Sequence, residues 1–127
     1  MHSDRTRPIR ILLVQDSPAP RELLHRLLGG AFDVQTAASC AEARLVASAS
    51  EGPPDVVVAD VQLADGDGVD LLAELQTVHG CRTIAMTDPD DAPRCRRAGI
   101  DRTVPRPLPY DDLQMLMIVM ATRGNAN

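Results

Sequence analysis

The chain has 127 residues, a length typical of one domain that buries a core without disulfides or metals. Its net charge of −5 argues against direct binding to nucleic acid, and its two aromatic residues cannot form a base-stacking surface. No apolar run approaches the ~20 residues of a membrane span, and the first ten residues do not resemble a secretory signal. The spacing of the three cysteines does not fit a metal site, which favours reduced thiols and a cytoplasmic location.

Five short apolar runs alternate with helical patterns along the chain. The predicted strands cover residues 9–14, 32–37, 56–60, 82–87 and 101–104. The predicted helices cover residues 21–28, with start signals at 17 and 18, and then 39–48, 69–78, 91–98 and 110–122. Such alternation predicts parallel strands joined by right-handed crossovers, and hence a three-layer, doubly wound α/β domain.

Two segments are predicted to be loops, residues 51–55 and 63–68, because proline, glycine and aspartate are concentrated there. We find no internal linker or repeat. The domain is expected to span residues 9–122, with tails at 1–8 and 123–127.

Polar side chains stand where four of the predicted strands end. Asp16 follows the first strand, Asp60 ends the third, Thr87 ends the fourth, and Arg106 follows the fifth. Because ligands of open parallel sheets bind beyond the carboxyl ends of the strands, these residues are expected to share one pocket. Two carboxylates with loop carbonyls favour Mg²⁺, a carboxylate can accept a phosphoryl group, and a hydroxyl and a cation can bind its oxygens. The pattern therefore indicates a phosphoryl-accepting aspartate with its metal.

The segments "ILLVQDS", "PDVVVADVQLADGDGVDLL", "TIAMT" and "GIDRTVPRP" resemble a response regulator receiver domain, the phosphoacceptor module of two-component signalling. The resemblance covers essentially the whole chain. It implies a flavodoxin-like sheet of five parallel strands in the order 2-1-3-4-5 with helices on both faces. It also implies signalling rather than enzymatic activity, beyond assistance with the domain's own phosphorylation and dephosphorylation.

The same resemblance assigns roles to individual residues. Asp60 would be the phosphoacceptor, and Mg²⁺ would be held by Asp16, Asp60 and the backbone carbonyl of Gln62. The expected switch residues are Thr87, Arg106 and Thr103, and the bond that precedes Pro107 is expected to be cis. The implied partners are a histidine kinase or phosphotransfer protein and a downstream protein, with no nucleic acid or membrane bound by this domain.

Several positions depart from the family pattern. Gln15 replaces an acid, which predicts weak Mg²⁺ binding because the pocket has two formal negative charges instead of three. Arg106 stands where the family has a lysine. Its guanidinium group is planar and permanently charged, and it binds oxygens through two N–H groups instead of one ammonium. Thr103 replaces an aromatic switch residue, and Asp88 adds a carboxylate where a small residue is usual. The segment between Thr87 and Arg106 is also short, which predicts a shortened fourth helix.

The last predicted helix carries more apolar residues than one face can bury. A core face is formed by helical spacing of Leu113, Leu116, Met117 and Met120. The apolar residues left over are Met115, Ile118 and Val119. They predict a surface for a partner or for a homodimer, although a broader core face would also accommodate them.

Two other functions compete with the phosphorylated receiver. A pseudo-receiver would bind proteins without phosphorylation and keep a pocket that no longer reacts. A flavodoxin-like or nucleotide-binding domain would need a phosphate-binding loop after the first strand, but "QDSPAPRE" contains no glycine and begins beside a carboxylate. The intact Asp16, Asp60 and Thr87 favour the phosphorylated receiver.

Overall fold

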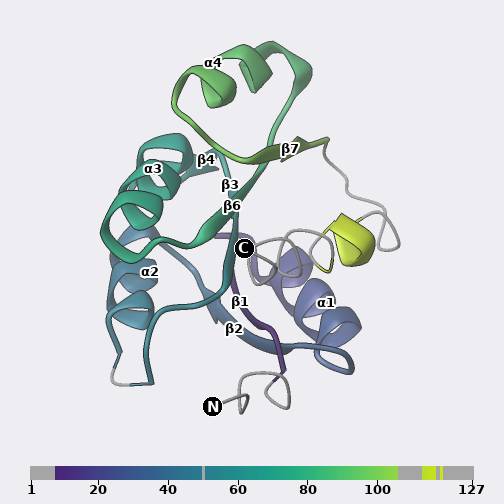
Figure 1. Ribbon diagram of the computed structural model, residues 1–127. Coiled ribbons are helices and arrows are strands. Elements are labelled where there is room, and N and C mark those ends of the chain that lie inside the picture. The colour runs from purple at the N-terminus through teal and green to yellow at the C-terminus, as the bar shows by residue number, and fades with distance from the viewer. Residues whose placement is uncertain (1–7, 50, 106–112, 117, 119–127) are drawn as a thin grey trace.

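A parallel sheet of five strands forms the centre of the molecule (Figure 1). The computed structural model of the chain describes residues 8–49, 51–105, 113–116 and 118. The sheet order is β2-β1-β3-β6-β7, which is the predicted order 2-1-3-4-5 once two very short strands are set apart. The bounds of these strands are β1 Arg10–Val14, β2 Asp33–Ala37, β3 Val56–Asp60, β6 Arg82–Met86 and β7 Arg102–Val104.

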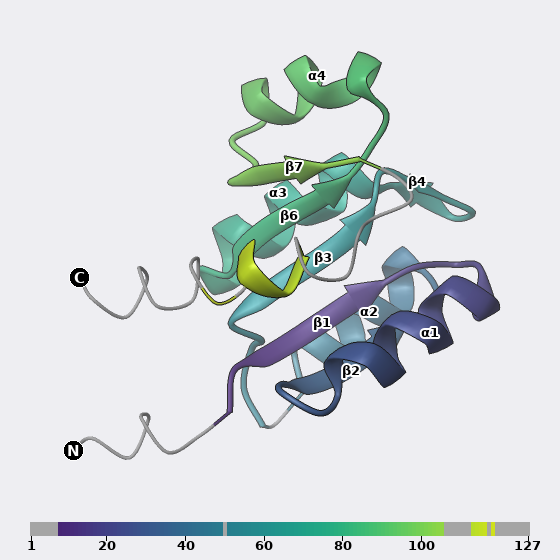
Figure 2. The same ribbon diagram turned by 90° about the vertical axis from the view of Figure 1, so that its right-hand side faces the viewer.

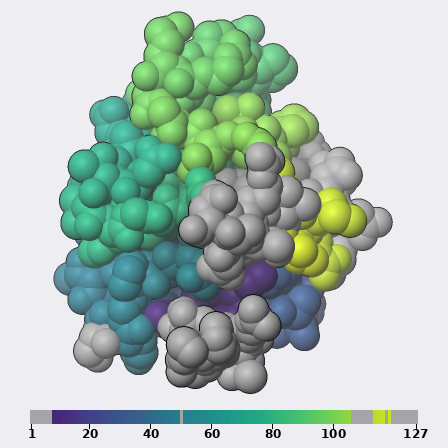
Figure 3. Space-filling model, viewed as in Figure 1, coloured from purple at the N-terminus to yellow at the C-terminus, as the bar shows by residue number. Residues whose placement is uncertain are grey.

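Helices cover both faces of the sheet and make three layers, as predicted (Figures 1 and 2). One face carries α2 (Cys40–Ala47), α3 (Gly68–His79) and α4 (Ala92–Arg97). The other face carries α1 (Pro18–Leu28) and a last helical segment whose described residues are 113–116 and 118. In the space-filling view, the green surface of α4 and β7 adjoins that of α3 (Figure 3).

The core is mostly aliphatic, with Phe32 as an aromatic member, and lies in two clusters, one on each face of the sheet. All five residues of β3 are buried, as are four of the five in β1 and in β6. Full burial of each valine, leucine or isoleucine contributes about 1.5–3 kcal/mol, so these strands stabilise the fold without aromatic residues. No helix in the described segments has the length and apolar character needed to cross a lipid bilayer.

Local signals explain where the helices on the first face begin and end. The Ser39 side chain accepts a hydrogen bond from the backbone N–H of Glu42 and thereby caps α2, as the sequence predicts. At the end of α3, Gly80 adopts a left-handed conformation (φ 74°) that glycine tolerates best. The α4 helix has only six residues and follows a 3-10 turn, η2 (Pro89–Asp91), so the predicted shortening is observed.

The predicted loop at 63–68 is wrong in its details. Gln62–Leu63 (β4) pairs with Gly66–Asp67 (β5) in a small antiparallel hairpin, and α3 already begins at Gly68. Two-residue strands are too short to show an alternating apolar pattern, so no strand was predicted there. The hairpin matters because it directly follows Asp60.

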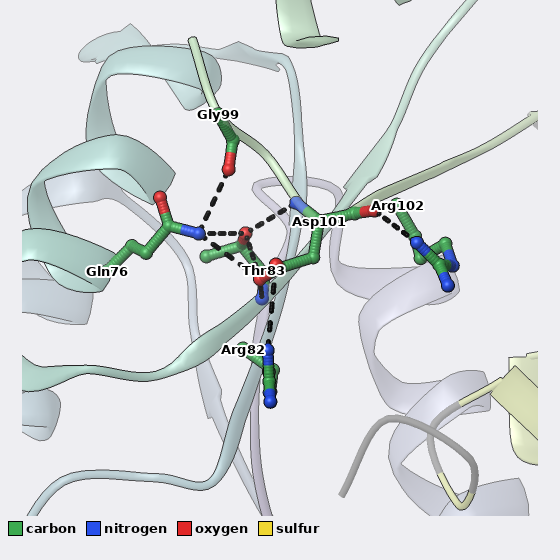
Figure 4. Close-up of polar contacts among 6 residues, drawn as sticks. All are labelled: Gln76, Arg82, Thr83, Gly99, Asp101 and Arg102. Atoms are coloured by element: carbon green, nitrogen blue, oxygen red, sulfur yellow. Dashed lines mark hydrogen bonds and ion pairs between the residues drawn. The ribbon is translucent and has the colours of Figure 1, made fainter. Parts of the chain in front are cut away.

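A polar cluster fixes the loop that leads into β7 (Figure 4). The Asp101 carboxylate accepts hydrogen bonds from the backbone N–H and the hydroxyl of Thr83, at 2.9 and 3.0 Å. The Gln76 amide of α3 donates to the Gly99 carbonyl at 2.9 Å and to Asp101 at 3.2 Å. Since Thr83 is fully buried at the start of β6, these bonds hold the start of β7 against α3 and β6.

Gly68 places the first turn of α3 directly on the backbone of Asp60. A Cβ atom at this position would lie 2.0 Å from the Asp60 carbonyl oxygen, far closer than real contacts allow. The Gly68 N–H also donates to the Val61 carbonyl at 2.9 Å. The start of α3 and the end of β3 therefore act as one packed unit.

We expect Gly68→Ala to destabilise the domain by about 1–3 kcal/mol, the usual cost of overpacking, because the clashing atom belongs to the backbone. Helix propensity alone predicts the opposite sign. The matched control is Gly30→Ala, where an added Cβ meets no atom within 4 Å. Urea unfolding measures both changes, and equal midpoints for the two variants would contradict this packing.

Candidate functional site

Buried polar side chains gather at the carboxyl edge of the sheet. Among the described residues four polar side chains are buried, and three of them lie at this edge: Gln15, Asp60 and Thr87, which are 7%, 6% and 3% exposed. They follow or end the adjacent strands β1, β3 and β6. This edge is where an open α/β sheet binds ligands.

Two neutral donors orient the Asp60 carboxylate. The backbone N–H of Gln62 donates to Oδ1 at 2.9 Å, and the side-chain amide of Gln15 donates to Oδ2 at 3.3 Å. The Gln15 amide is itself oriented, because its Oε1 accepts the backbone N–H of Ser17 at 3.2 Å. A buried carboxylate needs such donors to offset the loss of water. Asp60 is thus held at the end of β3 with both oxygens engaged.

Asp16 follows Gln15 at the same edge and is half-buried. The loop that carries it is tied to α1 by Arg21, whose Nη1 donates to the Gln15 carbonyl at 2.9 Å. This role of Arg21 was not predicted, because a lone arginine at the start of a helix is no sequence signal for it. Its effect is to hold the backbone on which Gln15 and Asp16 stand.

The oxygen donors at this edge suit a hard cation. Within the described segments no group of three or more histidine, cysteine, aspartate or glutamate side chains could hold a metal ion. An ion bound near Asp16 and Asp60 must therefore draw its other ligands from carbonyls and water, the set that Mg²⁺ prefers. The segment of Gln62, whose carbonyl is the predicted third ligand, already contacts Asp60 through its N–H.

Two further acids of the "DGDG" segment serve the helices instead of the pocket. The Asp65 carboxylate accepts the backbone N–H groups of Cys40 and Ala41, at 2.8 and 3.1 Å, and so caps α2. These two bonds, that of Cys40 first, hold the pKa of Asp65 below its usual value. Burial, followed by the charge of Asp65, raises the pKa of the Cys40 thiol to about 11, so it stays protonated.

Asp67 is the N-cap of α3, and its Oδ1 accepts the N–H of Val69 at 2.8 Å. Its Oδ2 pairs with Arg94 of α4. No role was predicted for this aspartate, although its place just before an amphipathic run is the usual signal of an N-cap. The pairing with Arg94 could not be predicted, because it depends on how α4 packs.

Thr87 lies beside Asp60 on the neighbouring strand end. Its hydroxyl donates to the backbone carbonyl of Asp88 at 3.0 Å, and its N–H donates to the Val104 carbonyl of β7 at 2.9 Å. Asp88 is exposed, and Thr103 is half-buried on β7 in register with Ala85. The threonine hydroxyl is therefore bonded within its own loop.

Three predicted site residues lie outside the described part of the chain, namely Arg106, Pro107 and Val119. The cationic side of the pocket and the cis peptide bond stay predictions from the sequence. Met115 and Ile118 are described, and they are 63% and 40% exposed. Leu113 is fully buried, and Leu116 packs against the core on the same face as α1.

Comparisons with known proteins agree with this geometry. Residues 11–117 match the family described as the response regulator receiver domain. A curated relative is the transcriptional regulatory protein KdpE of Mycobacterium tuberculosis, 32% identical over 120 residues that cover 91% of this chain. Another is a protein-glutamate methylesterase/protein-glutamine glutaminase of Azospirillum brasilense, 28% identical over 107 residues that cover 79% of this chain.

The solved structures give the same fold. A response regulator receiver domain protein from Clostridium thermocellum has a TM-score of 0.86 at 23% identity, with 93% of this chain and 98% of that chain covered. The receiver domain of a signal transduction histidine kinase from Syntrophus aciditrophicus has a TM-score of 0.75 at 25% identity, with 89% of each chain covered.

The chain spans 52% of the length of KdpE and 27% of the methylesterase. It aligns in both cases with a part of a longer protein. From the matched residues, the fold and the polar edge of its sheet, the chain belongs to the family of response regulator receiver domains of two-component signalling.

Proposed function

We propose that Asp60 of this receiver domain accepts a phosphoryl group from a histidine kinase or a phosphotransfer protein. The observation that carries this proposal is the buried Asp60 carboxylate, held at both oxygens at the end of β3 beside buried Thr87. A carboxylate that is already fixed in this way loses little conformational entropy when it reacts. The proposal places the domain in the cytoplasm, in agreement with its buried free thiols.

The chemistry required of the chain is simple. One carboxylate oxygen of Asp60 forms a P–O bond while the P–N bond of the donor's phosphohistidine breaks, and the donor nitrogen keeps the electron pair. The Gln62 N–H and the Gln15 amide keep the carboxylate aimed during the approach. The Thr87 hydroxyl, which now donates to the Asp88 carbonyl, reaches a phosphoryl oxygen by rotating about its side-chain bond. The domain itself turns over no other substrate.

Receiver domains generally bind Mg²⁺ at their acidic pocket. Here Asp16, Asp60 and the carbonyl of Gln62 would hold the ion, and when bound it neutralises charge on the phosphoryl oxygens. Gln15 weakens this site for two reasons. It removes a negative charge. A unit charge ~5 Å from a divalent ion, at an effective dielectric near 20, attracts that ion by up to about 6 kcal/mol before the cost of desolvation is subtracted. It also turns its N–H, rather than its oxygen, toward Asp60.

The same hydrogen bond supports one alternative, a pseudo-receiver that binds proteins without phosphorylation. The Gln15 amide is a neutral donor to the Asp60 carboxylate, and this interaction requires no metal ion. The exposed carboxylate of Asp88 repels an incoming phosphoryl group, and Thr103 lacks the aromatic ring through which the family usually couples to the switch hydroxyl. A labelling experiment on Asp60 separates the two functions.

The partner surface that we propose includes the last helical segment. Met115 and Ile118 are exposed there, and the neighbouring α1 on the same face of the sheet exposes Leu23 (52%) and Leu27 (39%). Large apolar side chains exposed on adjoining elements commonly mark an interface. A kinase or phosphotransfer protein, a downstream protein, or a second copy of this chain would bind there.

Incubation with Mg²⁺ and acetyl phosphate should add the mass of one phosphoryl group to the wild type. The adduct should be lost at alkaline pH, as acyl phosphates are, and should be absent from Asp60→Asn. The control Asp70→Asn, an exposed carboxylate at the start of α3, should keep the adduct. A wild type without the adduct, under conditions that label another receiver, would support the pseudo-receiver.

Gln15→Glu should tighten Mg²⁺ binding by roughly tenfold or more, since the charge restored at this distance is worth several kcal/mol before desolvation. The matched control Gln35→Glu adds the same charge on exposed β2 and should leave the affinity unchanged. Asp16→Asn should abolish binding. Isothermal calorimetry measures all of these, and an unchanged affinity in Gln15→Glu would mean that the ion binds elsewhere.

Met115→Glu should leave folding intact, because the side chain is 63% exposed, while weakening association. The readouts are the urea midpoint and the apparent mass in solution or, for a monomeric wild type, the rate of phosphotransfer from the donor protein. Leu45→Glu, at a 74% exposed position of α2 on the opposite face, is the control. Equal effects of the two variants on association would argue against this surface.

A further inference from the structure

The small helix α4 is weakly anchored in this domain. It has six residues, of which only Cys95 is buried, and it follows the loop that starts at Thr87. Thr103 provides no aromatic ring to connect Thr87 with the neighbouring surface. A different physical connection therefore has to carry any change at Asp60 to α4.

Such a connection begins at the phosphoacceptor itself. Asp60 Oδ1 accepts the N–H of Gln62, and Gln62 pairs with Asp67 across the β4–β5 hairpin. Asp67 in turn caps α3, because its Oδ1 accepts the N–H groups of Val69 and Asp70, at 2.8 and 3.4 Å. Displacement of the Gln62 segment thus reaches Asp67 through adjacent backbone bonds.

Asp67 also contacts α4. Its second oxygen, Oδ2, accepts a hydrogen bond from Nη2 of Arg94, and the two side chains are 36% and 39% exposed. This bond raises the pKa of Arg94, and the negative charges of Asp67, Asp70 and Asp91 raise it further. Partial burial alone would raise the pKa of Asp67, but the bonds from Arg94, Val69 and Asp70 outweigh it and the pKa is lowered. Both groups therefore stay charged at neutral pH.

We propose that the Asp67–Arg94 ion pair is a latch that couples α4 to the phosphoacceptor segment without the usual switch residues. The inference rests on phosphorylation of Asp60, the function proposed above. Formation of the acyl phosphate moves the negative charge from the Asp60 carboxylate to the phosphoryl oxygens, and the oxygens left on the side chain accept the hydrogen bond from Gln62 more weakly than a carboxylate does. The β4–β5 hairpin then shifts, the ion pair between Asp67 and Arg94 breaks, and α4 is no longer held to the hairpin.

Amide hydrogen exchange tests this latch, in samples whose phosphorylation state is checked by intact mass. In the unphosphorylated protein, Arg94→Gln should speed amide exchange in α4 by roughly two- to fivefold, the range expected for a half-exposed ion pair. Because coupling is reciprocal, exchange should also rise in residues 62–67. Asp67→Asn should act alike, since asparagine keeps the cap of α3 but not the charge.

Matched controls remove the same charges without breaking the pair. The first control is Arg97→Gln, at an exposed position of the same helix. The second is Asp70→Asn, in the first turn of α3. Neither should change exchange in residues 62–67. If Arg97→Gln speeds that exchange as much as Arg94→Gln does, the effect reflects net charge and the latch is refuted.

The phosphorylated samples complete the test. In wild type the phosphoryl adduct should speed exchange in α4, whereas in Arg94→Gln the adduct should form and α4 should change no further. An equal response of α4 in both proteins would overturn the latch while leaving phosphorylation established. Absence of the adduct in wild type would refute the proposed function, and the unphosphorylated comparison would then decide whether the tie between α4 and the hairpin exists.

Discussion

A carboxylate buried at the end of a central strand is the constraint on which the rest of the structure depends. Asp60 is 6% exposed, and a carboxylate in that position is stable only if donors reach both oxygens. Gln62 in the next loop donates to one oxygen, and Gln15, which follows the neighbouring strand β1, donates to the other. The hairpin after β3, the glycine that starts α3 and the orientation of the β1 loop all serve to keep those donors in place.

The "LADGDG" segment shows how neighbouring acids acquire different tasks from their surroundings. Asp65 and Asp67 face the first turns of α2 and α3, where unpaired backbone N–H groups favour negative charge. Asp60 instead lies at the carboxyl edge of the sheet, where it accepts hydrogen bonds from Gln62 and Gln15. Composition alone cannot separate these roles, because the direction in which each side chain points is set by the hairpin between them.

The central strands were predictable because "ILLV" and "VVVA" are continuous apolar runs, which are typical of strands covered on both faces. The strand order was implied by the resemblance to receiver domains. The rule that parallel strands end at one edge predicted that Asp16, Asp60 and Thr87 would lie there, and the resemblance added Gln15. The direction of the Gln15 amide was not predicted. The Asp67–Arg94 pair and the Thr83–Asp101 cluster join residues 27 and 18 positions apart. Such contacts depend on packing between helices and loops, for which a single sequence contains no periodic signal.

The Thr83–Asp101–Gln76 cluster (Figure 4) lies near the start of β6, whereas Asp60 pairs with Met86 at the end of that strand. It fixes the beginning of β7, while the end of β7 contacts Thr87 through the Val104 carbonyl. The three-residue strand pairs with β6 along its whole length, while the polar cluster holds its start and a backbone bond ties its end to Thr87. Only three positions along the chain separate Asp101 from Val104, so this short strand directly connects the two ends of the sheet.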